Sequence, residues 1–155
     1  MSGGRRYSGM SRIAQVIVLA KYADEVMEPL TRPDESRSWQ GHFEPLDLFV
    51  GGWVVEFHRV GPRTGLLKHL ESLPWPDPGH VQVLIHDEED DCFGLWMIHD
   101  GTLVEVPLPR TQRFHPPAPP SDEYAPSPGY LWRTDSGSGV PADLSAERQD
   151  PRPAW

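Results

Sequence analysis

Hydrophobic residues concentrate in short runs between Ile13 and Leu108, and glycine, proline or charged residues separate the runs. The runs are rich in β-branched and aromatic side chains, which is typical of β-strands. We predict strands at residues 12–22, 53–60, 81–86, 92–98 and 102–106. Asp100-Gly101 joins the last two, and this is the residue pair that two-residue hairpin turns favour. The pattern therefore predicts a mainly antiparallel sheet.

A helical pattern covers residues 62–72. The apolar positions that share one face of this helix are Leu66, Leu67, Leu70 and Leu73. Thr64 is placed to cap the helix, and Pro74 ends it because proline cannot continue the hydrogen-bond ladder. Trp75 follows in a stiff Pro-Trp-Pro connection, where we expect it to close the edge of the core.

A shorter helical pattern runs through residues 23–30 and is stopped by Pro29, and Gly51-Gly52 marks a bend before the second strand. The succession of these elements predicts one α+β domain at residues 12–114. We expect a single, mainly antiparallel sheet of about five strands with one main helix packed on one face.

The two ends of the chain differ in composition from this domain. Residues 1–11 are rich in glycine and serine, and we predict a flexible N-terminus. Residues 115–155 contain nine of the 18 prolines, so we predict a disordered Pro-rich C-terminal tail. Two apolar islands in the tail, residues 129–132 and Trp155, are candidates for docking on the domain or on a partner.

The net charge excludes some classes of partner. The formal charge of the chain is −9, and residues 11–114 carry 17 acidic against 9 basic side chains. Such a balance argues against nucleic acid and against an anionic membrane surface, because both require clustered Lys and Arg. It fits a soluble protein, or one that meets a basic partner through complementary charge.

Cys92 is the only cysteine, so no disulfide can form within the chain. A lone cysteine suits a reducing compartment, and neither a signal peptide nor an apolar span of about 20 residues is present. We therefore expect a cytoplasmic protein. The acids beside Cys92 should raise the pKa of its thiol, which favours a structural cysteine over a nucleophile.

The acidic run from Asp87 to Asp91 connects two of the predicted strands. It does not fit an EF-hand loop, because Cys92 would stand at the glycine position and Ile98 at the glutamate position. A solvated hairpin loop and a protein-binding surface both remain open. We predict that a partner binds here, through side chains that we expect to be exposed: Asp87, Glu88, Glu89, Asp90 and Asp91, with the aromatic residues Trp75 and Trp96.

No cofactor, metal ligand or catalytic residue is predicted. The seven histidines contain neither His-x₃-His nor His-Glu-x-x-His, and no Gly-x-Ser-x-Gly occurs. One arrangement keeps an enzyme open as an alternative. His86 and His99 flank a predicted strand, and if they meet across the sheet they could form a small metal-dependent hydrolase site with Asp87 and Asp100.

The stretch LESLPWPDPGHVQVLIHDEEDDCFGLWMIHDGTLVEV combines a short helix, a Trp-Pro turn, a β-meander and an acid-rich loop. In these features it resembles the small acidic α+β immunity proteins of bacterial polymorphic-toxin systems. The resemblance implies neutralisation of a toxin by occlusion of its basic active site.

These observations together predict a non-enzymatic protein-binding module, in the form of an immunity-type or other inhibitory partner of a basic protein. The small hydrolase is one alternative. Another is an accessory subunit of a larger bacterial assembly, tethered by its Pro-rich tail.

Overall fold

The fold is that of a computed structural model, which describes residues 13–47, 50–58, 63–88, 90–114 and 130–135. Its main sheet has six strands in the order β2-β3-β1-β4-β5-β6, and every pair of neighbours is antiparallel. The strands of this sheet are β1 (Ala14–Leu19), β2 (Glu44–Pro45), β3 (Gly52–Phe57), β4 (Gln82–Asp87), β5 (Gly94–His99) and β6 (Thr102–Val106). A separate two-stranded sheet pairs β7 (Thr111–Phe114) with β8 (Tyr130–Arg133).

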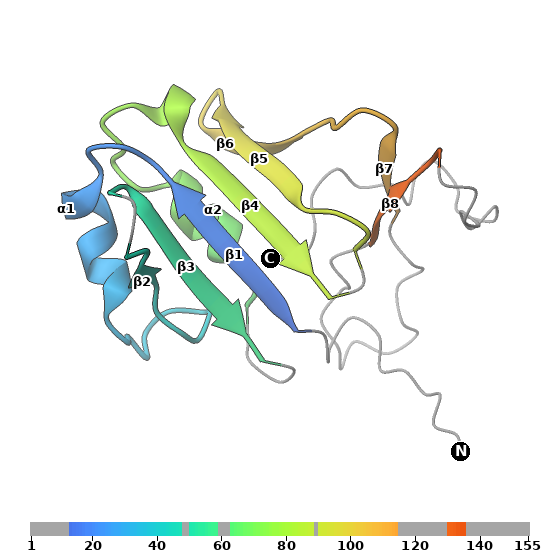
Figure 1. The fold of residues 1–155 in the computed structure, drawn as a ribbon. Coiled ribbons are helices and arrows are strands. Elements are labelled where there is room, and N and C mark those ends of the chain that lie inside the picture. Colours follow the sequence, from blue (N-terminus) through green and yellow to red (C-terminus); the bar gives the residue numbers. More distant parts are fainter. Residues whose placement is uncertain (1–12, 48–49, 59–62, 89, 115–129, 136–155) are drawn as a thin grey trace, which may run out of the picture.

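The helices are short. They are α1 (Asp24–Met27), α2 (Leu66–Glu71) and the 3₁₀ turns η1 (Glu28–Thr31) and η2 (Pro78–His80). Figure 1 shows α2 lying across one face of the main sheet, behind β1 and β4 in that view. The predicted class, α+β with a mainly antiparallel sheet, is confirmed, and each of the five predicted strands is present.

The core lies between the main sheet and α2. β1 occupies the centre of the sheet, where Val16 faces Val55 of β3 on one side and Ile85 of β4 on the other. The apolar face predicted for the helix supplies the second layer, because Leu66, Leu67 and Leu70 are completely buried. Burial of side chains of this size contributes roughly 1.5–3 kcal/mol each, and Trp39 and Phe43 from the loop before β2 are completely buried in the same core.

Local sequence signals explain most element boundaries. Asp100 and Gly101 both have positive φ (54° and 77°), as a type I′ hairpin requires, and the predicted hairpin is confirmed. The main helix begins later than predicted, because Gly65 precedes it with a φ of 90° and no side chain caps it, so the proposed Thr64 cap is wrong. Pro29 ends α1 only in part, since the chain continues through it as the 3₁₀ turn η1.

Strand β8 lies in the segment that was predicted to be a disordered tail. Residues 130–133 form this strand, and Leu131 is buried, so one of the two apolar islands docks on the protein. Residues 1–12, 115–129 and 136–155 lie outside the described part, and their disorder stays a prediction. In the described part, no helix is long and apolar enough to cross a membrane.

Candidate functional site

The acidic run, predicted to be a free surface, points partly into the protein. Asp87 ends β4 with 1% of its surface exposed, and the Asp90 side chain is fully buried. Glu88 and Asp91 are exposed, and Glu89 lies outside the described residues. The expectation of a uniformly exposed run is therefore wrong for Asp87 and Asp90. Binding of a partner at the exposed acids stays a prediction.

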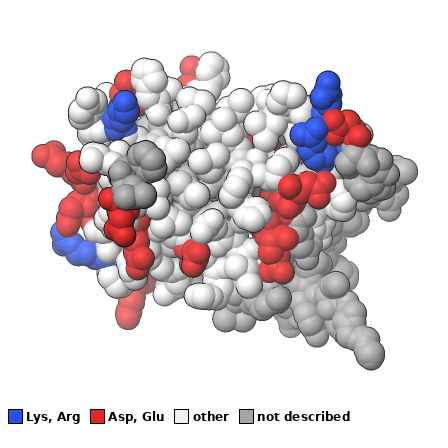
Figure 2. Space-filling model, viewed as in Figure 1, with Lys and Arg blue, Asp and Glu red and all other residues white. Residues whose placement is uncertain are grey.

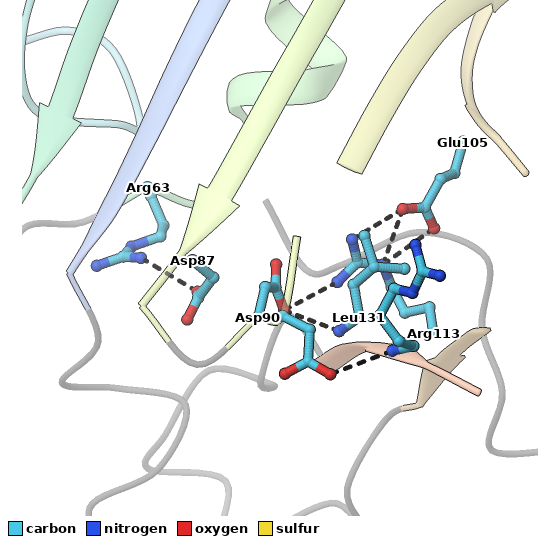
Figure 3. A network of polar contacts seen from close by, with 8 residues as sticks. Arg63, Asp87, Asp90, Glu105, Arg113 and Leu131 are labelled. Atoms are coloured by element: carbon cyan, nitrogen blue, oxygen red, sulfur yellow. Dashed lines mark hydrogen bonds and ion pairs between the residues drawn. The ribbon is translucent and has the colours of Figure 1, made fainter. Parts of the chain in front are cut away.

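The two buried acids of the run face different arginines, as Figure 3 shows: Asp90 faces Arg113 of β7, whereas Oδ2 of Asp87 lies 4.0 Å from Nη1 of Arg63. The guanidinium of Arg113 donates hydrogen bonds to both carboxylate oxygens of Glu105, at 2.9 Å from Nε and 2.8 Å from Nη2. Its Nη1 also lies 3.7 Å from Oδ1 of Asp90. Facing charges and hydrogen bonds of this kind offset the cost of placing charged groups in a low-dielectric interior.

Two further features define the Arg113 pocket. Burial by itself lowers the pKa of the guanidinium, but the hydrogen bonds with Glu105 and the charge of Asp90 outweigh burial and raise the pKa. Gly94 provides the space, because a Cβ atom there would lie 2.7 Å from Nη2 of Arg113 and 2.8 Å from Oε2 of Glu105. The ion pair and the glycine are therefore one packed unit.

The acidic run also fastens β8 to the rest of the protein. Oδ1 of Asp90 accepts a hydrogen bond from the Leu131 amide at 2.8 Å, and the Asp91 amide donates to the Leu131 carbonyl at 2.8 Å. The Arg133 amide donates to Oδ2 of Asp91 at 3.1 Å. At the start of the run, the Glu88 amide donates to the Ile13 carbonyl at 2.9 Å. Backbone contacts of this kind give the run a structural role.

Sequence reasoning missed the partners Glu105 and Arg113, although one signal was available. Glu105 has the same strand parity as Leu103, which is completely buried, so its carboxylate points to the core side of β6. An acid at a core-facing position requires a cation or several donors to remain charged. Arg113 is the second arginine after the predicted meander, and Arg110 is the first.

The two tryptophans that were expected to be exposed are buried. Trp96 is 0% exposed, because it stands on the core side of β5 opposite Val83. Trp75 is 7% exposed, and its indole nitrogen donates to the Leu70 carbonyl at 2.7 Å. The expected exposure of both is wrong, whereas the predicted closure of the core edge by Trp75 is confirmed.

The histidine pair of the hydrolase alternative does not come together. In the β4–β5 register, His86 stands beside Phe93, with ring centroids 4.5 Å apart, while His99 lies six residues further along β5. Six strand residues span about 20 Å, so the expected approach is wrong. Among the described residues, no group of three or more His, Cys, Asp or Glu side chains is placed to hold a metal ion.

Cys92 is half-buried beside the same loop. Burial raises the pKa of its thiol, and the charges of Asp90 and Asp91 raise it further. The predicted direction is confirmed, with burial as the larger cause. A thiol that stays protonated is a weak nucleophile, which agrees with a structural cysteine.

The main sheet has a second face, on the side away from α2, and this face is also apolar. We call it the open face, and its apolar members are Ile17, Leu19, Val54, Leu84, Leu95, Met97, Val104 and Val106. All but one are half-buried by their own neighbours, and Val104 is 41% exposed. Figure 2 looks onto this side of the molecule, and the centre of the view is white, without charged groups.

An apolar second face is unusual for an antiparallel sheet. Such sheets normally alternate apolar residues facing the core with polar residues facing water, whereas strands covered on both faces read as continuous hydrophobic runs. β1, β4 and β5 follow the second pattern, with Ile17, Leu84 and Leu95 placed directly opposite one another. The sequence of these strands is therefore that of a layer covered on both sides.

Charge on the open face has one sign. At strand positions on this side, the charged residues are Glu44 and Glu56, and neither Lys nor Arg occurs there in the six strands of the main sheet. Glu88 continues the same parity beyond β4 and is exposed. Acidic groups flank the white centre of Figure 2, while Lys and Arg groups lie toward its left and upper right margins. The open face offers an apolar surface bordered by carboxylates.

No protein-family model, curated protein or solved structure matches this chain. The chemistry of the open face is complementary to an apolar surface that carries positive charge at its border. Asp90 and Asp91 of the acidic run hold β8 in place.

Proposed function

We propose that this protein is a non-enzymatic binding module for a basic protein, acting in the cytoplasm as an immunity-type inhibitor. The observation that carries the proposal is the open face, where eight apolar side chains lie on the side of the sheet away from α2. Exposed apolar areas bordered by polar groups are typical of protein interaction sites.

The charges support a basic partner over other classes. Carboxylates border the open face, and the chain as a whole carries −9. Complementary charge increases the association rate and excludes acidic partners. Glu88, an exposed member of the acidic run with the parity of the open face, adds to the border, whereas Asp87 and Asp90 are committed to the interior.

The proposal is tested by capture of partners on the tagged full-length protein in an extract of the source organism, followed by purification of the captured protein. We expect a basic protein that binds stoichiometrically and loses affinity as salt is increased, because salt screens exposed charges. If it is a toxin, co-expression of this chain should abolish its toxicity. An acidic partner, or an affinity independent of salt, would contradict the proposal.

A further inference from the structure

We propose that the open face receives one amphipathic helix of the basic partner, with the apolar side of that helix on the sheet and its Lys or Arg side chains toward Glu56 and Glu88. The inference rests on the proposed function and specifies where and in what form the partner binds. It follows from the dimensions of the open face, from the position of its charges and from their sign.

The apolar residues of the open face form two rows across the strands. The longer row runs through five strands, because the register places Val54, Ile17, Leu84, Leu95 and Val106 side by side. Four interstrand spacings give it a length of about 19 Å. The shorter row lies two residues further along the strands, about 7 Å away, and contains Leu19, Met97 and Val104 with Gln82.

This shape fits one helix. An α-helix with side chains is about 10–12 Å wide, and a length of 19 Å corresponds to about 13 residues, or between three and four turns. Two rows about 7 Å apart occupy most of the width of such a helix. The other side of the same sheet provides an internal example, since α2 covers it with Leu66, Leu67 and Leu70.

The next row of side chains on this face is polar and acidic. It contains Glu56, Gln15 and His86, and the Gln15 amide donates to the Glu56 carboxylate at 3.0 Å. Glu88 lies two residues beyond His86, so it continues the open-face positions of β4, and it is exposed. A helix seated on the two apolar rows therefore has carboxylates along one side, where Lys or Arg complements them.

The same charges disfavour a second copy of this chain as the occupant. In a two-fold dimer the same patch meets itself, so each acid on the face must be matched by a base on the same face. The strand positions of the open face contain Glu44 and Glu56 and no Lys or Arg. Stacking two such faces would bring carboxylates together without counter-charges.

The probe is a synthetic helical peptide of about 14 residues with a leucine stripe flanked by lysines, and its control has glutamate in place of every lysine. Both are titrated into the isotope-labelled full-length protein and followed by NMR. We expect the lysine peptide to shift the methyl signals of Leu84, Leu95 and Met97, and to bind about tenfold or more tightly than the glutamate peptide.

Matched variants localise the site. Leu84→Lys and Val104→Lys each change the net charge by one on the open face, and Glu35→Gln makes the same change on an exposed loop. Each lysine variant should weaken the lysine peptide about tenfold, because it removes apolar contact and adds a like charge, whereas Glu35→Gln should change affinity less than about twofold. The edge position of Val104 keeps the test valid if Leu84→Lys does not fold.

Five results would overturn the inference. Peptide-induced shifts confined to the α2 side, or equal affinities of all variants, would place the ligand elsewhere. Sedimentation of the free protein as a dimer that Val104→Lys dissociates would identify a second copy as the occupant. If the Leu84 and Leu95 methyls of the free monomer are protected from a soluble gadolinium chelate, another segment of this chain already covers the open face. If the captured basic partner binds Val104→Lys normally, the site is wrong and the proposed function stands.

Discussion

The indole nitrogen of Trp39 donates a hydrogen bond to Nδ1 of His69 at 2.9 Å. Trp39 is completely buried, and its ring also packs edge-on against Phe43 and Phe57. Because Nδ1 accepts this bond, His69 must be neutral with its proton on Nε2. The loop before β2 and helix α2 are thus joined by a contact that depends on the protonation state of one residue.

This contact predicts that the protein loses stability in mild acid. Burial lowers the pKa of His69, and the charge of Arg37 lowers it further. The unfolded chain therefore binds the proton more readily than the folded chain, so the free energy of unfolding is highest above the ordinary histidine pKa of about 6.5 and falls as the pH drops below it. Urea unfolding at several pH values measures this slope. His69→Gln should reduce the slope, and a slope equal to that of the unsubstituted protein would contradict the role assigned to His69.

Trp39→Phe tests the hydrogen bond itself. The substitution removes the donor and leaves the Nδ1 acceptor of His69 half-buried, which should lower the free energy of unfolding by about 1–3 kcal/mol. The same substitution should restore the His69 pKa toward its ordinary value, because protonation no longer breaks the bond with the indole. NMR titration of the His69 ring detects this, and an unchanged pKa would contradict the role assigned to the bond.

Arg113→Met should be strongly destabilising. It leaves the carboxylates of Glu105 and Asp90 in the interior without their cation, and breaking a buried pair in this way costs about 3–5 kcal/mol. Arg133 of the neighbouring strand is the matched control. It holds Asp135 with the same two-pronged geometry, but its side chain is 45% exposed. Arg133→Met should therefore lower the free energy of unfolding much less than Arg113→Met in the same urea titration.

Two glycines with positive φ should respond differently to alanine. An alanine at Gly65 (φ 90°) or at Gly101 (φ 77°) would meet the same backbone strain of roughly 1–2 kcal/mol, because positive φ is unfavourable for residues with a Cβ atom. A Cβ atom at Gly101 enters open space, whereas one at Gly65 would lie 2.5 Å from Oγ of Ser38, which donates to the Thr64 carbonyl. Gly65→Ala should lower the thermal midpoint more than Gly101→Ala. Equal shifts of the thermal midpoint would contradict this expectation and would mean that Ser38 moves away from the added methyl group.

The Cys92 thiol should react slowly. Its pKa is raised by burial, then by Asp90 and Asp91, so little thiolate is present at neutral pH. The rate of alkylation by iodoacetamide should be lower than that of free cysteine, and its rise with pH should come later. Asp91→Asn removes an exposed charge and should shift that rise to lower pH. A rate equal to that of free cysteine would show that the thiol is not protected.

The positions of the strands and of the main helix follow from local patterns. The hairpin at Asp100-Gly101 requires positive φ at both residues, which Asp and Gly adopt readily. The leucine spacing of α2 follows from the helical repeat. Predictions of side-chain exposure are wrong where they rest on the neighbouring residues in the sequence alone. Trp96 was expected on the surface, although its parity in β5 places it opposite Val83 in the core.

The acidic run illustrates what local patterns cannot contain. Five consecutive acids are typical of a solvated loop, yet Asp90 is buried because Arg113 arrives from β7 and the Leu131 amide from 41 residues away. Each of these partners is separated from the run by intervening elements. Their meeting depends on the β7–β8 pairing, whereas the sequence marks residues 129–132 only as a candidate docking segment and does not show which strand it pairs with.

The sequence by itself determined five strands of the main sheet, the main helix, the Asp100-Gly101 hairpin and the acidic balance of this protein, because dihedral preferences, side-chain periodicity and charge are properties of short segments. The tertiary structure decided which of the acids are buried and that His86 and His99 stand at opposite ends of their hairpin. It also decided that the apolar residues of β1, β4 and β5 that point away from α2 lie side by side and form the open face. Burial and register are set by contacts between distant segments, and these form only when the chain packs as a whole.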